Sequence, residues 1–238
     1  MQKTKNSIVV FSFLLFLAVL PGCEKRFDNI DEYEKFVKGS DSPLKQQAVK
    51  NDIVFDLSYY PTDAVLIPEY RRCMREKNIL VNNKSISELE KKHRLTQLTD
   101  ELKKQKKSID NYLVFILSIQ NTKTGRSIEF ANFNKIYYDG KTWIERLLFG
   151  MREFIFIKTA YGKEIPLSFY NMERNYGLTN ELKFMIYFPR YYEKKDLLNN
   201  KELSLFMIRE FGLSTGEVDL PCDQVQDYKY TFIPINIK

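Results

Sequence analysis

The chain has 238 residues, a formal net charge of +6 and a single histidine. This length suffices for one sizeable hydrophobic core or, at most, two small domains. The positive excess is small and spread along the sequence, whereas nucleic-acid-binding proteins gather basic residues into a stripe, so we expect no nucleic-acid partner. A single histidine also excludes metal sites that need paired histidines, and we expect no metal and no cofactor.

Residues 1–22 have the layout of an export signal. Two lysines near the start precede an almost wholly apolar block, "IVVFSFLLFLAVL", which Pro21 and Gly22 end. A basic start followed by a short apolar block is typical of a secretory signal peptide. The block is too short for a membrane span, which needs roughly 20 apolar residues.

The motif "LPGC", from Leu20 to Cys23, resembles the lipobox of bacterial lipoproteins. In that family the signal is cut before the cysteine, which then carries acyl chains. The resemblance implies that Cys23 is lipidated and that the protein is attached to a membrane of the bacterial cell envelope without crossing it, since two or three acyl chains suffice for stable anchoring. Glu24 does not resemble the aspartate that retains some lipoproteins at the inner membrane, which favours the outer membrane and leaves open the side that it faces.

Residues 23–50 are mostly polar and predict a lipidated tether. They contain a weakly amphipathic piece near Ile30 to Val37 and then the flexible break "GSDSP". We expect at most a short helix there. A flexible chain of this length would let the rest of the protein stand clear of the lipid headgroups.

The remaining residues, 51–238, predict a single β-rich globular domain. Residues 52–60, "DIVFDLSYY", alternate apolar and polar side chains as a half-buried strand does. Residues 68–77 read as a short helix, with a proline at its first position. Residues 85–107 form the strongest helix prediction, since capping-box serines precede it and "KKQKK" ends it where the helix dipole favours cations.

Beyond that helix the pattern changes to period two. Short apolar stretches, of which 111–120 and 181–188 are the clearest, are separated by close turns. Such spacing favours antiparallel pairing over parallel βαβ units. The predicted fold class is therefore α+β, mainly antiparallel β as a twisted sheet or sandwich, with one long covering helix.

Two cysteines remain if Cys23 is acylated. Cys73 and Cys222 form an even pair in a compartment that permits disulfides. A bridge between them would close a long loop and add about 4–5 kcal/mol in the chain-entropy treatment. The alternative is two separate buried thiols that pack as small apolar side chains.

Three tyrosine doublets lie at the ends of strands or loops. Neighbours in a strand point to opposite faces, so each doublet can place one ring in the core and one outside. The outward rings are candidates for contact with a sugar or a partner side chain, and ordinary sheet packing is the alternative. These candidates are Tyr60, Tyr138 and Tyr192.

Catalytic motifs in a credible context are absent, so no catalytic residue is assigned and we do not expect an enzyme. The acidic residues near the end of the chain lack the spacing of a calcium loop and read as a solvated loop. The expected function is a lipid-anchored envelope protein that binds or assembles with an envelope protein partner. The alternatives are a glycan-binding lipoprotein that uses exposed tyrosines and an envelope hydrolase with unidentified acidic residues.

Overall fold

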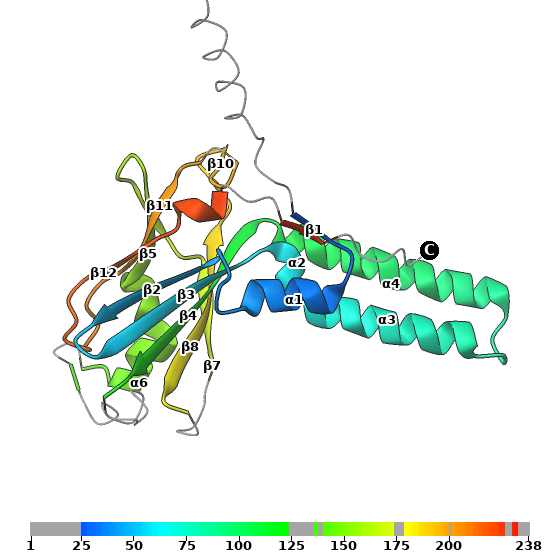
Figure 1. The fold of residues 1–238 in the computed structure, drawn as a ribbon, viewed down its shortest axis with the longest axis horizontal. Helices are drawn as coiled ribbons and strands as arrows, with labels where there is room; N and C mark the ends of the chain where they lie inside the picture. The colour runs from blue at the N-terminus through cyan, green and yellow to red at the C-terminus, as the bar shows by residue number, and fades with distance from the viewer. Residues whose placement is uncertain are drawn as a thin grey trace, which may run out of the picture.

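The computed structural model describes residues 25–123, 136–137, 140–173, 179–199, 201–226 and 230–232. It confirms the α+β class: eleven of the strands in the described residues lie in antiparallel sheets, and the longest helix has 22 residues. Figure 1 shows two sheets packed together at one end of the molecule and a pair of helices that extends from the other.

The larger sheet has five antiparallel strands in the order β2-β3-β4-β8-β7. Along β8 half-buried residues alternate strictly with buried ones, so one face of the sheet forms the core and the other faces outward. The strands are β2 (Lys45–Lys50), β3 (Ile53–Tyr60), β4 (Tyr112–Asn121), β7 (Phe169–Glu173) and β8 (Glu181–Pro189).

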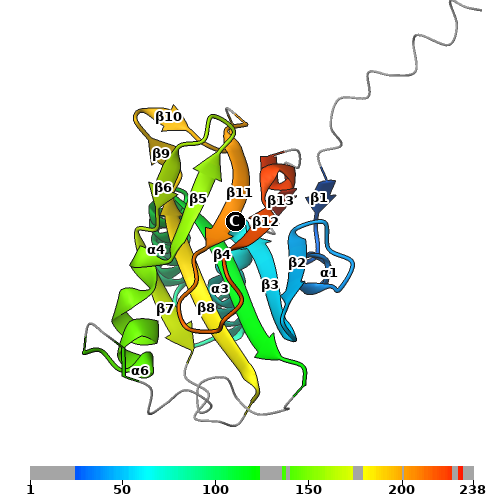
Figure 2. The ribbon, with the colours of Figure 1, turned by 90° about the vertical axis from the view of Figure 1, so that its left-hand side faces the viewer.

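A second antiparallel sheet, in the order β12-β11-β5-β6, lies over the inner face of the first (Figure 2). The two sheets share one core, because the ring of Phe206 lies 5.5 Å from that of Phe115 and 5.7 Å from that of Phe188. The strands of this sheet are β5 (Ile155–Thr159), β6 (Glu164–Pro166), β11 (Leu203–Ile208) and β12 (Val218–Pro221).

Shorter elements close the ends of the sandwich. A parallel pair joins the first and last strands, and a small hairpin precedes β11. These elements are β1 (Lys25–Phe27), β13 (Tyr230–Phe232), β9 (Tyr191–Tyr192), β10 (Lys195–Asp196), the short helix α6 (Trp143–Glu145), a π-helical turn (Arg146–Gly150) and two 3-10 turns (Met151–Glu153 and Asp223–Gln226).

The helices α3 (Ile67–Asn82) and α4 (Glu88–Ile109) lie side by side and form what we call the helical arm. The side chain of Ser87 caps α4 by accepting from the Glu90 N–H, as the sequence predicts. The arm meets the sheet at the short helix α2 (Thr62–Val65) and points away from it beyond that (Figure 1). Among the described residues, no helix has both the length and the apolarity that a membrane crossing requires.

The tether expected over residues 23–50 is wrong for residues 25–50. This segment contains β1, the helix α1 (Ile30–Lys38) and β2, which pairs with β3 along its whole length. Five of its apolar side chains belong to the hydrophobic core: Phe27, Ile30, Tyr33, Val37 and Leu44. The reason is that Ile30, Tyr33 and Val37 fall on one face of α1, where three buried side chains suffice to dock a largely polar helix.

Candidate functional site

The outer face of the five-stranded sheet is polar around Asp56. On β3, Asp56 and Ser58 point outward, whereas Leu57 between them is buried in the core. Strand pairing brings polar residues of the neighbouring strands into line with Asp56. The row formed in this way is Gln47, Asp56, Ser118 and Lys183, each directly opposite the next.

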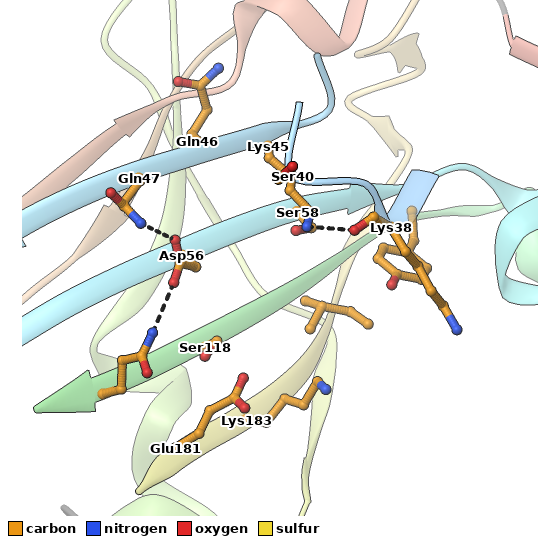
Figure 3. A pocket seen from close by; sticks show the side chains of 13 residues that line it. Lys38, Ser40, Lys45, Gln46, Gln47, Asp56, Ser58, Ser118, Glu181 and Lys183 are labelled. Carbon is orange, nitrogen blue, oxygen red and sulfur yellow. Dashed lines mark hydrogen bonds between the residues drawn. The ribbon is translucent and has the colours of Figure 1, made fainter. Parts of the chain in front are cut away.

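An open hollow of about 680 Å³ lies over this face (Figure 3). Strands β2, β3, β4 and β8 form its floor, and the end of α1 with the turn that follows forms one edge. Its lining combines two carboxylates, six lysine or glutamine side chains and several hydroxyls. The residues used below are Lys45, Gln47, Asp56, Tyr60, Gln120 and Lys183. We call this the sheet hollow.

Asp56 is held in the centre of the sheet hollow by two amides. Gln47 Nε2 donates to Asp56 Oδ1 at 2.7 Å, and Gln120 Nε2 donates to Asp56 Oδ2 at 3.4 Å (Figure 3). The three residues come from adjacent strands, so the sheet itself fixes their positions. Each glutamine keeps its amide oxygen as an acceptor, and the carboxylate keeps spare lone pairs, so a ligand meets mixed donors and acceptors.

Lysines flank the sheet hollow on two sides. Lys45 Nζ donates to the main-chain oxygen of Lys38 at 2.8 Å, which places a cation at the C-terminal end of α1, where the helix dipole favours it. On the opposite side, Lys183 lies 3.9 Å from the carboxylate of Glu173 on β7. Both amines therefore lie at the rim in defined places, and each has further donor capacity for a ligand.

Tyr60 lines the sheet hollow, as its assignment as an outward ring requires, while its neighbour Tyr59 is buried. Burial raises the pKa of the Tyr60 hydroxyl, and the charge of Lys38 opposes this rise. The hydroxyl therefore stays protonated at neutral pH and can act as a hydrogen-bond donor. Tyr60 is the one predicted tyrosine that the structure places in this site.

Of the other two tyrosine candidates, the structure describes Tyr192, which does not line the sheet hollow. Tyr192 is half-buried on β9, where Lys163 Nζ lies 4.8 Å from the centre of its ring. In this doublet Tyr191, which is 52 % exposed, is the outward ring, and the prediction had named Tyr192. Tyr138 and the lipidation candidate Cys23 lie outside the described residues.

The possible disulfide is not present. Cys73 on α3 and Cys222 after β12 are both buried as free thiols, which corresponds to the alternative of two separate apolar positions. Burial raises the pKa of the Cys222 thiol to about 12 and also raises that of Cys73. Neither thiol is therefore a ready nucleophile at neutral pH.

The part of the chain that the structure describes contains no cluster of metal-binding groups. No three His, Cys, Asp or Glu side chains there gather closely enough to hold an ion. Of the acidic residues near the end of the chain, Glu217 and Asp219 are exposed, and Asp227 lies outside the described residues.

The polar row across β2, β3, β4 and β8 is the feature that sequence reasoning missed. Its local signal is visible, because Asp56 and Ser58 alternate with apolar residues in one strand. The alternation does not show which strands pair, and it is this pairing that places Gln47 and Ser118 on either side of Asp56.

Comparisons with known proteins give no function. No protein-family model matches the chain, and no curated protein does. A crystal structure of a protein of unknown function from Burkholderia pseudomallei is similar at 9 % sequence identity over 83 % of each chain, with a TM-score of 0.37. A likeness this weak supports no inference about either fold or activity.

Proposed function

We propose that the chain is a lipid-anchored, non-enzymatic binding protein of the bacterial cell envelope, and that its ligand is a glycan held in the sheet hollow. The observation that supports this ligand is the row of outward polar residues around Asp56. Sugar hydroxyls both donate and accept, and amides, a carboxylate and amines presented side by side complement them. The ring of Tyr60 adds a surface on which the apolar face of a sugar can pack.

The polarity of the sheet hollow favours a glycan over the protein partner that the sequence alone suggested first. The centre of a protein interface is depleted in charged residues. Asp56 occupies the middle of this face, where a protein partner would have to remove its carboxylate from water. Large exposed apolar side chains do not line the sheet hollow: Ile79, Val81 and Leu89 lie on the helical arm, and Val49 and Phe169 lie on the edge strands β2 and β7 outside the lining.

The setting of Asp56 also favours binding over hydrolysis. Both of its oxygens accept from amide groups, Gln47 on one side and Gln120 on the other. A general acid needs a carboxyl that holds a proton near neutral pH, usually through an apolar environment or a second carboxylate close by. The two amide donors instead hold the carboxylate in place, which suits a fixed acceptor for sugar hydroxyls.

Anchoring rests on the "LPGC" motif and on where the folded part begins. Only Glu24 separates Cys23 from Lys25, the first residue of β1. Two chain steps span roughly 7 Å at most, so acyl chains on Cys23 would hold the domain directly at the headgroup layer. The sheet hollow would then lie within one domain diameter of the membrane.

Binding to immobilised glycans tests the ligand. The chain from residue 23 onward, with Cys23→Ser, is applied to an array of peptidoglycan fragments, lipopolysaccharide O-chains and soluble polysaccharides. Asp56→Asn and Tyr60→Leu should each weaken retention about tenfold, the loss of about 1.4 kcal/mol of contact. Tyr161→Ala is the matched control, because this tyrosine is 83 % exposed in the turn between β5 and β6.

Three outcomes would reject this ligand. Retention of the wild-type chain on none of the glycans would do so, as would equal losses in the control and the two site variants. Release of shortened sugars from a retained glycan would replace binding by the hydrolase alternative. Thermal melting of each variant separates loss of binding from loss of folding.

A further inference from the structure

The net positive charge of the chain is concentrated on the helical arm. Residues 67–109 contain twelve of the 37 Lys and Arg residues and six of the 31 Asp and Glu residues, a net charge of +6. The rest of the chain carries 25 residues of each sign and is neutral. The even spread of charge expected from the sequence is therefore wrong, because the fold gathers the excess on one projection (Figure 1).

One flank of the arm is neutralised by its own ion pairs. Arg72 pairs with Glu69 and Glu76, each at 2.8 Å, and Arg94 pairs with Glu90 at 2.6 Å. These pairs match Arg72 and Arg94 each with at least one carboxylate. Little positive potential is left there to attract a partner.

The opposite flank of α4 keeps its charge. Lys92, Lys103 and Lys107 fall within a sector of about 60° on the helix surface, at about 100° per residue. Lys92 and Lys107 form no ion pair with any residue that the structure describes, and Lys103 lies 3.5 Å from Asp100 in a pair that is largely exposed. We call this sector the basic flank.

Exposed apolar side chains accompany these lysines. Leu89 falls in the same sector of α4 and is 80 % exposed. Val81 of α3, 54 % exposed, lines a shallow groove of about 610 Å³ together with Lys92 and Lys103. Clustered lysines are attracted to anionic lipid surfaces, and exposed apolar side chains beside them add contact with the acyl boundary.

We propose that the basic flank of the helical arm rests on an anionic phospholipid bilayer. Its lysines would meet headgroup phosphates, and Leu89 and Val81 would enter the boundary between headgroups and acyl chains. Charge complementarity supports this occupant, because each Lys near an anionic membrane surface strengthens binding. The long, flexible lysine side chains can also reach headgroups that move within the bilayer.

The base of the helical arm lies close to the first described residues of the chain, which also supports a membrane as its partner. Phe27 of β1 packs on the rings of Tyr33 and Phe36 in α1, at 5.2 and 5.0 Å. Arg71 of the arm in turn pairs with Asp31 of α1 at 2.5 Å. The residues that follow Cys23 are thus fixed to the base of the arm, so an anchored chain would bring the arm to the same membrane.

Vesicle binding tests this surface without the anchor. The chain from residue 23 onward, with Cys23→Ser, is sedimented with vesicles of phosphatidylcholine alone or of phosphatidylcholine mixed with phosphatidylglycerol. We expect binding only to the mixed vesicles, and a decrease as salt is added, since salt screens exposed charges. Lys92→Gln with Lys107→Gln should weaken binding about 30-fold, about fivefold for each lysine.

Lys158→Gln with Lys194→Gln is the matched control, because both lysines are exposed, lie outside the arm and form no ion pair with a described residue. This control should bind like the wild-type chain. Equal binding to both kinds of vesicle would overturn the proposal, and so would equal losses in the two double variants. Binding to single-stranded DNA that depends on Lys92 and Lys107, with no binding to vesicles, would assign the arm to nucleic acid instead. Because neither sheet hollow nor acyl chain is involved, this result is independent of the glycan test.

Discussion

Lys106 of α4 donates a hydrogen bond to the buried carboxylate of Asp63, with Nζ 2.6 Å from Oδ1. The hydroxyl of Tyr70 on α3 donates to the same oxygen at 2.8 Å. Asp63 lies in α2, which begins two residues after the end of β3. One carboxylate thus ties both helices of the arm to the end of the sheet.

Loss of Lys106 should destabilise the protein more than loss of a neighbouring lysine. Lys106→Met leaves Asp63 buried without its cation and should lower the free energy of unfolding by about 1–3 kcal/mol, below the range for fully buried pairs because Lys106 is partly exposed. Lys107→Met, at an exposed position, should stay within about 0.5 kcal/mol of wild type. Urea denaturation measures both, and equal stability of the two variants would show that the contact does not join arm and sheet.

Phe27 tests whether the segment before α1 is folded. Phe27→Ala should cost about 3 kcal/mol, since the ring is buried against α1. Lys35→Ala, on the exposed side of α1, should have an effect below about 0.5 kcal/mol. If residues 23–50 were a tether, the two substitutions would be indistinguishable in thermal melting.

The ionised carboxyl of Glu210 should stabilise the fold at neutral pH, and this stabilisation should be lost in acid. Partial burial acts to raise the pKa of its carboxyl, but hydrogen bonds from the N–H groups of Gly212, Gly216, Ser214 and Thr215 outweigh this and lower it. A carboxyl whose folded pKa is lowered stabilises the fold above its unfolded value near 4.5, and this stabilisation is lost as pH falls through the folded pKa.

Unfolding free energies measured from neutral pH down to about pH 3 would show this dependence. Glu210→Gln should be less stable than wild type at neutral pH, and the two curves should converge in acid. A constant difference between them over the whole range would mean that the charge of Glu210 does not hold the loop.

The two buried thiols should be inert in the folded protein. Cys73 and Cys222 are free, and burial raises the pKa of both. Iodoacetamide should modify neither at neutral pH before unfolding and both afterwards, as read by mass spectrometry. A melting temperature that falls on addition of a reducing agent would contradict this and indicate a bridge.

Strands and the long helix were predictable because their patterns are local. The alternation in β3 and β8 and the cap at Ser87 each need only a few neighbouring residues. The helix α1 was underestimated, since its buried face consists of Ile30, Tyr33 and Val37 in an otherwise polar stretch. Composition over a window hides such a face, whereas docking needs only those side chains.

Of the residues that form the sheet hollow, only Tyr60 was predicted from the sequence. Alternation correctly assigned Tyr60 to the outer face, because the neighbouring ring is in the core. The row of Gln47, Asp56, Ser118 and Lys183 depends on strand order and register across distant parts of the chain. One sequence carries no direct signal for that pairing, and a shift of one residue would turn each side chain to the opposite face.

An envelope-anchored binding protein requires acyl chains on Cys23. Bacteria that produce the full chain are fed a fatty acid with an alkyne group, and the purified protein is coupled to a fluorescent azide. We predict a signal for the wild-type chain that Cys23→Ser abolishes and that Cys73→Ser with Cys222→Ser leaves unchanged. A wild-type chain without signal, or a signal that persists in Cys23→Ser, would contradict the proposed anchor and the envelope location that depends on it.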